Sequence, residues 1–361
     1  MEMMPPAALK KAFTNGLLKW NREDNTREMP WKGEKDPYRI WISEIILQQT
    51  RVEQGRDYYN RFIKLFPDIQ KLAKAPDEKV FKCWEGLGYY SRCRNLIATA
   101  RYIAKENKGV FPDTYDEILE LKGIGPYTAA AIASFAFQLP HAVVDGNVFR
   151  VLSRYFGIAT ATDSTTGKKL FTELAEDLLD KKQPGIYNQA IMDFGAVICK
   201  PAAPLCENCV LKKKCVALTT ARVQELPVKA KKSRIRDRWF IYFILEHKGY
   251  IAVRQRKAKD IWQDLYEFPM VEMKKVPGRK MRLQDPALQT WLGKVKVTEL
   301  ETPVTFRQLL SHQQVHGYFR VLQTDSRPPG DESWEWVRKE QLKKLSFPGL
   351  INQYLVKNNI R

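Results

Sequence analysis

The sequence lacks the features of a membrane or secreted protein. No stretch approaches the ~20 consecutive apolar residues that span a bilayer, and the longest candidate, 128–137, has the length of a buried helix. The first thirteen residues lack a continuous apolar core and a small-residue cleavage site, so we expect no secretory signal. We therefore expect a protein of the reducing cytoplasm, nucleoid-associated if bacterial, with no membrane partner and no disulfides.

Acidic residues are also few relative to basic ones. Lys and Arg number 60 against 41 Asp and Glu, so the 361-residue chain carries a formal net charge of +19. A surface with this excess attracts polyanions, nucleic acid first and acidic membranes second. Charge alone leaves open a soluble basic protein without such a partner. The length is sufficient for two or three domains.

Strand-like alternation is scarce before about residue 220, where apolar residues recur at three- and four-residue spacing. This pattern predicts a mainly α-helical region over 1–221, followed by a solvated basic linker over 222–237. Strand-like patterns then predict an α+β domain over 238–361. The predicted helices are 7–20, 38–48, 58–65, 77–84, 94–105, 115–121, 127–137, 147–156, 168–180, 186–197 and 338–345. The predicted strands are two within 238–256, one at 294–298 and one at 315–323.

Four of the six cysteines lie close together in the sequence. Cys199, Cys206, Cys209 and Cys215 have the spacing C-x6-C-x2-C-x5-C, whereas the other two stand apart as ordinary residues. Clustered thiolates in a reducing compartment indicate metal ligands. Zinc sites usually contain two C-x2-C pairs, so a single pair with longer flanking gaps favours a 4Fe–4S cluster. Zinc remains the alternative. The LKKK run at 211–214 either rests against a DNA backbone or is the solvated basic face of a purely structural clip.

Two glycines and two acids occupy positions that suit DNA chemistry. Gly123 and Gly125 lie between two predicted helices, where backbone N–H groups can hold a phosphate, although such a pair is often an ordinary loop. Glu44 projects among apolar residues of its helix, which would raise its pKa, unless it is solvated or paired with Arg39 or Arg51. Asp145 precedes a helix and is either a simple N-cap or a carboxylate facing a developing sugar cation.

Several motifs together resemble the MutY-type adenine DNA glycosylases of the endonuclease III-like helix-hairpin-helix superfamily. They follow one another in the same order as in that family, over about residues 20–220. The motifs are WISEIILQQTRVE (41–53), WEGLGYYSR (84–92), LKGIGPYT (121–128), VDGNVFRV (144–151), NQAIMDFGAVIC (188–199) and the cysteine spacing. The resemblance implies a helix-hairpin-helix six-helix barrel with an iron–sulfur cluster module, against which the first helix packs.

The resemblance also implies roles for individual residues. Glu44 would protonate the leaving adenine and Asp145 would stabilise the sugar cation, supported by Tyr127 and Asn147. The extruded base would lie among Arg27, Trp31, Gln49 and Gln189. Tyr89, together with Gln49, would wedge into the base stack, which requires an aromatic loop to be exposed rather than buried in the core. Bifunctional relatives carry a Lys where this chain has Tyr127, so we expect a monofunctional enzyme that leaves an abasic site.

The C-terminal region resembles the Nudix-like domain of this family, through IWQDLYEFP (261–269) and LLSHQQVHGYF (309–319). It lacks the R-E-x-x-E-E run of a Nudix hydrolase, because Glu267 and Glu272 stand alone. The resemblance therefore implies a lesion-recognition domain in which Ser311 and His312 read 8-oxoguanine. Leu310 replaces the usual Phe of that loop, and His312 could instead be a plain surface histidine.

The predicted function is excision of adenine opposite 8-oxoguanine or guanine in double-stranded DNA, by a monomer. The alternatives are an endonuclease III-like glycosylase and abasic-site lyase, and a non-catalytic DNA-binding protein. Tyr127 argues against the first, and the presence of both Glu44 and Asp145 argues against the second. A third alternative, a nucleotide hydrolase, fails because the chain lacks the acidic run that such an enzyme needs.

Overall fold

The structure, a computed structural model, describes residues 5–230, 235–274, 286–329 and 334–360. The chain forms two compact units: Met1–Lys74 with Asn95–Lys232, and Ala75–Arg94 with Ser233–Arg361. The segment 75–94 was expected in the helical region but groups with the second unit. Hydrogen bonds explain this grouping, because Glu85 accepts from the backbone N–H of Phe347 and from Asn352, while Lys82 donates to the carbonyl of Leu345.

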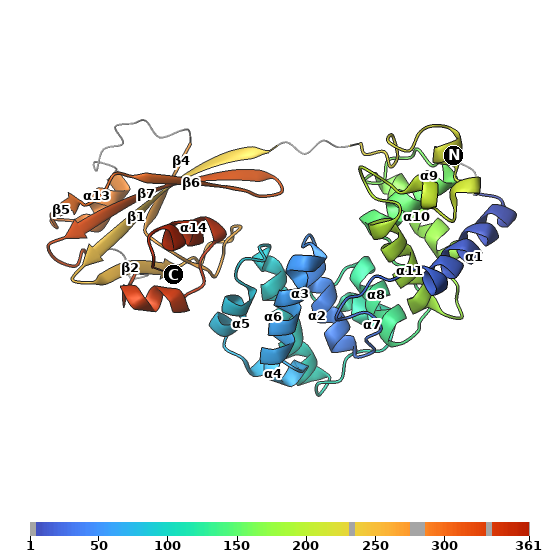
Figure 1. Ribbon diagram of the computed structural model, residues 1–361. Helices are drawn as coiled ribbons and strands as arrows, with labels where there is room; N and C mark the ends of the chain where they lie inside the picture. The colour runs from blue at the N-terminus through green and yellow to red at the C-terminus, as the bar shows by residue number, and fades with distance from the viewer. Residues whose placement is uncertain (1–4, 231–234, 275–285, 330–333, 361) are drawn as a thin grey trace. The chain divides into compact units, whose positions relative to one another are not determined.

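The first unit is built from helices, as the sequence predicts (Figure 1). The prediction missed α4, and it began α3 and α6 several residues late. The helices are α1 (Ala7–Glu23), α2 (Pro37–Leu47), α3 (Val52–Leu65), α4 (Ile69–Lys74), α6 (Tyr90–Glu106, which begins in the second unit), α7 (Tyr115–Glu120), α8 (Pro126–Ala136), α9 (Gly146–Phe156), α10 (Thr165–Leu178), α11 (Pro184–Val197) and α12 (Val216–Thr219), with 3-10 turns η1 (Cys206–Asn208) and η2 (Lys212–Lys214).

Local sequence signals begin several of these helices. The side chains of Asp36, Thr114, Asp145 and Ser164 accept hydrogen bonds from backbone N–H groups of the first turns of α2, α7, α9 and α10. These caps satisfy donors that a helix leaves without internal partners. Proline occupies the first position of α2, α8 and α11, where its missing N–H costs nothing.

The main core of the first unit joins α1 to helices far along the chain. Phe13 and Leu17 of α1 are fully buried in one cluster with residues of α8 to α11 and with Leu211. Leu211 lies between the third and fourth clustered cysteines, and three of those cysteines pack against the same cluster. The structure therefore confirms the prediction that the first helix packs with the cysteine module.

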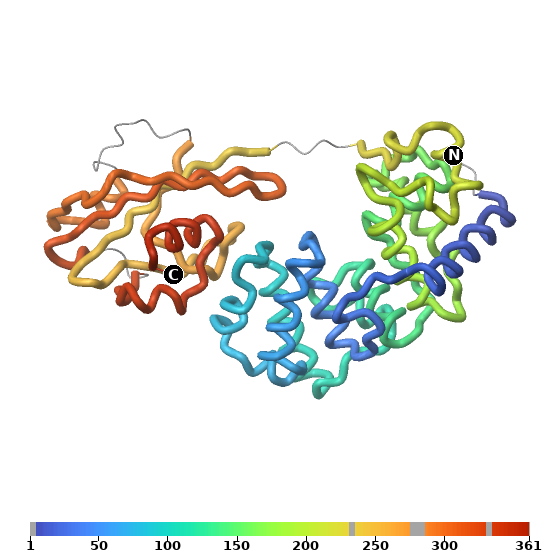
Figure 2. Tube along the Cα trace, viewed as in Figure 1, coloured from blue at the N-terminus to red at the C-terminus, as the bar shows by residue number. Residues whose placement is uncertain are grey.

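The second unit contains a mixed sheet in its described residues. Strand order is β3-β2-β1-β7-β5, with β4 paired to β1, β6 to β7 and β8 to β2. β1 runs parallel to β7 from Arg236↔Gln313 to Glu246↔Gln323, whereas β6 and β7 form a long antiparallel hairpin (Figure 2). The strands are β1 (Arg236–His247), β2 (Tyr250–Gln255), β3 (Tyr266–Glu267), β4 (Met270–Met273), β5 (Val297–Glu299), β6 (Val304–Leu309), β7 (Gln313–Thr324) and β8 (Glu335–Arg338).

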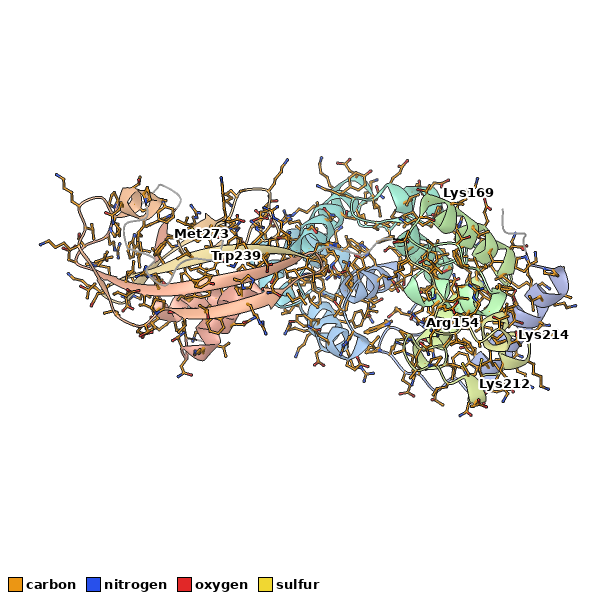
Figure 3. All side chains as sticks on the ribbon, turned by 90° about the horizontal axis from the view of Figure 1, so that it is seen from above. Arg154, Lys169, Lys212, Lys214, Trp239 and Met273 are labelled. Atoms are coloured by element: carbon orange, nitrogen blue, oxygen red, sulfur yellow. The ribbon has the colours of Figure 1, made fainter. Side chains whose placement is uncertain are left out.

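Short helices accompany this sheet. They are α5 (Asp77–Trp84), α13 (Pro286–Leu292), α14 (Gly349–Lys357) and the 3-10 segment η3 (Lys339–Lys344). A buried cluster on one face contains Ile241, Phe243 and Leu245 of β1 with Leu288 and Leu292 of α13. At the edge of that face Trp239 pairs with Met273 of β4 (Figure 3). Alternate residues of β1 thus build the core, as strand geometry requires.

Three further predictions need correction. The helix expected over 338–345 is the 3-10 segment η3, and the strand expected at 294–298 is the three-residue β5. The linker was expected to be solvated throughout 222–237, yet Leu226 is only 2% exposed. The described first part of the linker is bound to the first unit, because the Val228 carbonyl accepts from the Thr162 N–H at 3.0 Å.

None of the helices in the described part of the chain has the length and apolar character of a membrane-spanning helix.

Candidate active site

The hairpin between α7 and α8 has the conformation that its glycines permit. Gly123 has φ +82°, and a Cβ there would lie 2.6 Å from Asn95. Gly125 is the N-cap of α8, and no atom outside its immediate neighbours lies within 4 Å of the position of a Cβ. The first glycine is therefore required by backbone conformation and packing, whereas the second leaves open space at the positive end of a helix.

Glu44 is buried where α2 packs against α8. The residue is only 7% exposed, and its carboxyl group hydrogen-bonds with the Tyr127 hydroxyl. The same hydroxyl lies 3.5 Å from the Met192 sulfur. Burial is the largest cause that raises the pKa of Glu44 to about 7, and nearby Asp145 adds to the increase. Pairing with Arg39 does not occur, since Arg39 lies 3.5 Å from Glu34 instead.

Asp145 is an N-cap and also lines the cavity beside Glu44. One carboxylate oxygen accepts from the backbone N–H groups of Asn147 and Val148 at 2.9 and 2.8 Å, and the other accepts from the Asn147 amide at 2.7 Å. Burial raises the pKa of Asp145, and these hydrogen bonds oppose the increase. Arg150 in turn donates to the Asn147 side chain at 2.7 Å. The capping role and a role in the cavity are therefore compatible.

A cavity of about 350 Å³ joins these groups. Its lining includes Glu44, Tyr127, Asp145 and Asn147, and also Arg27, Trp31 and Gln189. Gln49 does not line it. Gln49 is exposed just beyond α2, with a left-handed φ of +60° that is uncommon for a residue other than glycine. Three of the four residues expected around the base are thus brought together with both acids.

Sequence reasoning missed a buried acid beside this cavity. Asp193 of α11 is 0% exposed and accepts from Arg27 at 2.8 Å, Lys32 at 3.0 Å and Gln189 at 3.0 Å. The available signal was its position four residues after Gln189, which puts both side chains on one face of a helix. Lys32 also lines the cavity and was not selected.

The four clustered cysteines line a second small pocket, together with Arg154 and Leu205. None is in a disulfide, and each is partly buried. No group of three or more His, Cys, Asp or Glu side chains in the described part of the chain is arranged to hold a metal ion. All four thiols nevertheless line the same pocket, as the ligands of a larger group of several metal atoms would. Lys212 and Lys214 are exposed on the same loop (Figure 3).

Two arginines of α9 connect this loop to the cavity. Arg150 donates to the carbonyl of Cys199 at 2.7 Å, and Arg154 lies 3.5 Å from the Cys199 sulfur. Arg154 also donates to the carbonyls of Lys200 and Pro201. The helix that begins at Asp145 therefore fixes the start of the cysteine loop through charge-assisted hydrogen bonds.

In the second unit, the loop between β6 and β7 lies against the segment before α6. The Tyr89 hydroxyl hydrogen-bonds with Ser311, and both residues line a pocket that also includes Leu310 and His312. Tyr89 is 40% exposed and has φ +48°, so it is not an aromatic core residue. His312 is exposed, and its carbonyl accepts from the N–H of Arg236 at 3.0 Å.

The two acids of the second unit that stood alone in the sequence are both paired with arginine. Glu267 is 1% exposed and contacts Arg254 at 3.0 Å and also Arg256. Glu272 contacts Arg238 at 2.7 Å. Carboxylates that are paired with arginine in this way are poor candidates for binding a catalytic metal ion.

Two domain families match the chain in sequence. Residues 42–176 match the family described as HhH-GPD superfamily base excision DNA repair protein, and residues 241–357 match the NUDIX domain. An adenine DNA glycosylase of Buchnera aphidicola is 35% identical over 305 residues, which cover 83% of each chain. The chain belongs to the adenine DNA glycosylase family. The human adenine DNA glycosylase is 32% identical over 91% of this chain and 71% of the relative.

Two solved structures are similar in fold to the helical part of this chain. A thermostable thymine-DNA glycosylase is 32% identical with a TM-score of 0.55, over 59% of this chain and 98% of that one. Endonuclease III in a non-covalent DNA complex is 19% identical with a TM-score of 0.51, over 60% and 99%. The predicted fold class, a helix-hairpin-helix region followed by a Nudix-like domain, is therefore confirmed.

Proposed function

We propose that this member of the family removes adenine paired with 8-oxoguanine or guanine from double-stranded DNA, and leaves an abasic site. The observation that carries the proposal is the meeting of a buried, readily protonated Glu44 with Asp145 in one cavity. Cleavage of an N-glycosidic bond needs an acid for the departing base and a negative charge for the sugar cation. The cavity contains one of each.

Glu44 acts as the general acid. A carboxyl group with a pKa of about 7 is half protonated at neutral pH, whereas an exposed glutamate is almost entirely ionised. The protonated group donates to a ring nitrogen of adenine, which makes the base a better leaving group. The Tyr127 hydroxyl holds the carboxyl group in place. The resulting carboxylate then accepts a proton from the attacking water.

Asp145 stabilises the positive charge that develops on the sugar as the bond breaks. Its three hydrogen bonds to Asn147 and Val148 hold the carboxylate at the N-terminus of α9. A carboxylate fixed before the reaction does not need to reorganise when charge appears, which is the main source of electrostatic catalysis. Asn147 therefore contributes by orienting Asp145.

Tyr127 makes the proposed enzyme monofunctional. A lyase reaction through a Schiff base requires an amine, and a phenol cannot form one. The chain should release adenine without cutting the strand. An endonuclease III-like lyase is the alternative, and substitution of Tyr127 by Lys is a direct test of whether an amine at this position reaches the sugar.

Cys199, Cys206, Cys209 and Cys215 would hold a 4Fe–4S cluster. Their shared pocket and the arginine contacts to the Cys199 segment support this assignment. A bound cluster would fasten the loop through these four cysteines. The exposed Lys212 and Lys214 on that loop are available to contact DNA phosphates.

Ser311 and His312 would read 8-oxoguanine in the second unit. They are exposed at the tip of the β6–β7 hairpin and line a pocket with Tyr89. Because Glu267 and Glu272 are paired with arginines, nucleotide hydrolysis is not proposed for this unit. The domain would then provide recognition, and the cavity of the first unit would provide chemistry.

The experiment that tests the function is incubation of the enzyme with duplexes containing adenine opposite 8-oxoguanine, guanine or thymine. Products are analysed with and without alkali, and separate samples are treated with borohydride. We expect free adenine and alkali-labile strands for the first two duplexes, with little trapped enzyme. Asp145→Asn is the matched inactive control. No adenine release from either mispair contradicts the proposal, and efficient borohydride trapping favours the lyase alternative.

A further inference from the structure

Asp193 is a buried carboxylate that is surrounded by four side-chain donors. Its oxygens accept from the Asn25 amide at 2.9 Å, Arg27 at 2.8 Å, Lys32 at 3.0 Å and the Gln189 amide at 3.0 Å, and the residue is fully buried. Burial of an ionised group is costly unless it is paired and hydrogen-bonded. Two cations and two amides satisfy that requirement here.

The partners of Asp193 reach the cavity although Asp193 does not. Arg27, Lys32 and Gln189 line the cavity that contains Glu44, whereas Asp193 lies behind them. A base in the cavity would therefore meet the partners and not the acid itself. Any influence of Asp193 on recognition must act through the orientation of these side chains.

The contact with Gln189 determines which end of its amide faces the ligand. An ionised carboxylate only accepts hydrogen bonds, so the NH₂ group of Gln189 must point to Asp193. The carbonyl oxygen of the same amide is then the end available to the cavity. That oxygen can accept from a ligand donor but repels a ligand acceptor.

Purine bases differ at the atom that such an acceptor can read. Adenine carries an amino donor at its 6-position, whereas guanine carries a carbonyl acceptor there, and hypoxanthine has the same 6-oxo group as guanine. A pinned carbonyl oxygen of Gln189 pairs with the first and opposes the other two. With the amide reversed, the preference would be lost or inverted.

We propose that Asp193 is a positioning residue that makes the cavity select 6-aminopurines over 6-oxopurines, by holding the Gln189 amide in one orientation. This inference rests on the proposed function, since it requires that the cavity receives the excised base. It adds a determinant that lies outside the reacting groups Glu44 and Asp145.

The test compares single-turnover excision of adenine and of hypoxanthine, each placed opposite guanine, by the wild type and by Asp193→Asn. Asn keeps the shape of Asp, but its own NH₂ group can donate to the carbonyl of Gln189 and allow the amide to turn. We expect the ratio of the adenine rate to the hypoxanthine rate to fall by ~10-fold or more, because unmatched buried polar groups discriminate strongly. A folded Asp193→Asn protein with an unchanged ratio overturns the proposal.

Two further variants identify the route of the effect. In a Gln189→Ala background, Asp193→Asn should not change the ratio again, because the amide that it orients is absent. Asp180→Asn is the matched control, since Asp180 holds the Gln183 amide at 2.8 Å before the same helix and neither residue lines the cavity. Asp180→Asn should leave the ratio at the wild-type value, and a similar fall there contradicts a specific role for Asp193.

Loss of a buried negative charge could prevent folding, so a charge-balanced double variant, Asp193→Asn with Lys32→Gln, accompanies the single one. It should show the same fall in the ratio. Equal losses for adenine and hypoxanthine in folded variants mean that Asp193 is merely structural. Failure of the wild type to excise adenine at all contradicts the proposed function instead, so the two failures are distinguishable.

Discussion

Glu44→Gln separates the catalytic effect of the buried carboxyl group from its effect on stability. Gln has almost the same size and can keep a hydrogen bond with Tyr127, but it cannot donate a proton as an acid does. The variant should bind the mispair normally, because binding depends on phosphate contacts and on the lesion. Its adenine release should fall by at least ~10²-fold, the usual scale for a missing general acid.

The pH dependence follows from the pKa of about 7. The protonated fraction of Glu44 is about one half at pH 7 and falls ~10-fold for each further pH unit. The single-turnover rate of the wild type should therefore fall on the alkaline side of pH 7 with that slope. The residual rate of Glu44→Gln should lack this alkaline limb, since an amide does not titrate.

The same burial has a predictable effect on stability. The pKa of Glu44 is about 7 in the folded state against an ordinary value of 4.5, so the folded state binds more protons than the unfolded state between these values. The contribution of Glu44 to the free energy of unfolding is therefore highest below pH 4.5 and decreases as pH rises towards 7, by about 3 kcal/mol in total from the two pKa values. Glu44→Gln does not lose this amount, so it should be more stable than the wild type at pH 8.

The assay combines single-turnover excision at pH 6 to 9 with urea unfolding of both proteins at pH 5 and pH 8. We expect an inactive variant that is more stable at pH 8, with a smaller difference at pH 5. Excision at the wild-type rate by Glu44→Gln refutes the assignment of the general acid. Equal stability of the two proteins at pH 8 refutes the argument that burial raises the pKa.

The other predictions concern DNA contact, the cluster and lesion reading. Gly125→Asp puts a carboxylate at the open N-terminus of α8 and should weaken binding to all duplexes alike, by ~1–3 kcal/mol in titrations. Gly123→Ala should instead lower the melting temperature of the protein, because the φ of Gly123 is +82°. Purified protein should contain about four irons per chain by metal analysis, and Cys206→Ala should lose iron and solubility; stoichiometric zinc from iron-replete cells contradicts the cluster. Ser311→Ala with His312→Ala should reduce the preference for 8-oxoguanine over guanine opposite adenine, while equal losses on both substrates indicate a role in folding only.

The local features of the first unit could be predicted from the sequence because they depend on neighbouring residues. The helical periodicity, the cap at Asp145 and the left-handed φ of Gly123 each depend on residues within a few positions along the chain. The cysteine spacing belongs to the same class. The positions of β1, β2 and β7 were also predictable, since each is a run of β-branched and aromatic residues with a buried apolar centre.

Elements that depend on distant partners were not predictable in this way. β4 and β8 are four-residue strands whose pairing partners, β1 and β2, lie far from them in the sequence. The grouping of 75–94 with the second unit depends on Glu85 and Lys82, whose partners are more than 250 residues away. The spacing of polar and apolar residues contains no information about such contacts.

The chemistry of the cavity shows the same division. The sequence by itself determined that Glu44 lies on an apolar helix and that Asp145 begins another, but not that they share a cavity with Tyr127. Only the tertiary structure decided the pKa of Glu44, because desolvation depends on every element packed around the carboxyl group. It also decided that Asp193, one acid among many in the sequence, is fully buried among Arg27, Lys32 and Gln189, since residues from two distant segments must meet to enclose it.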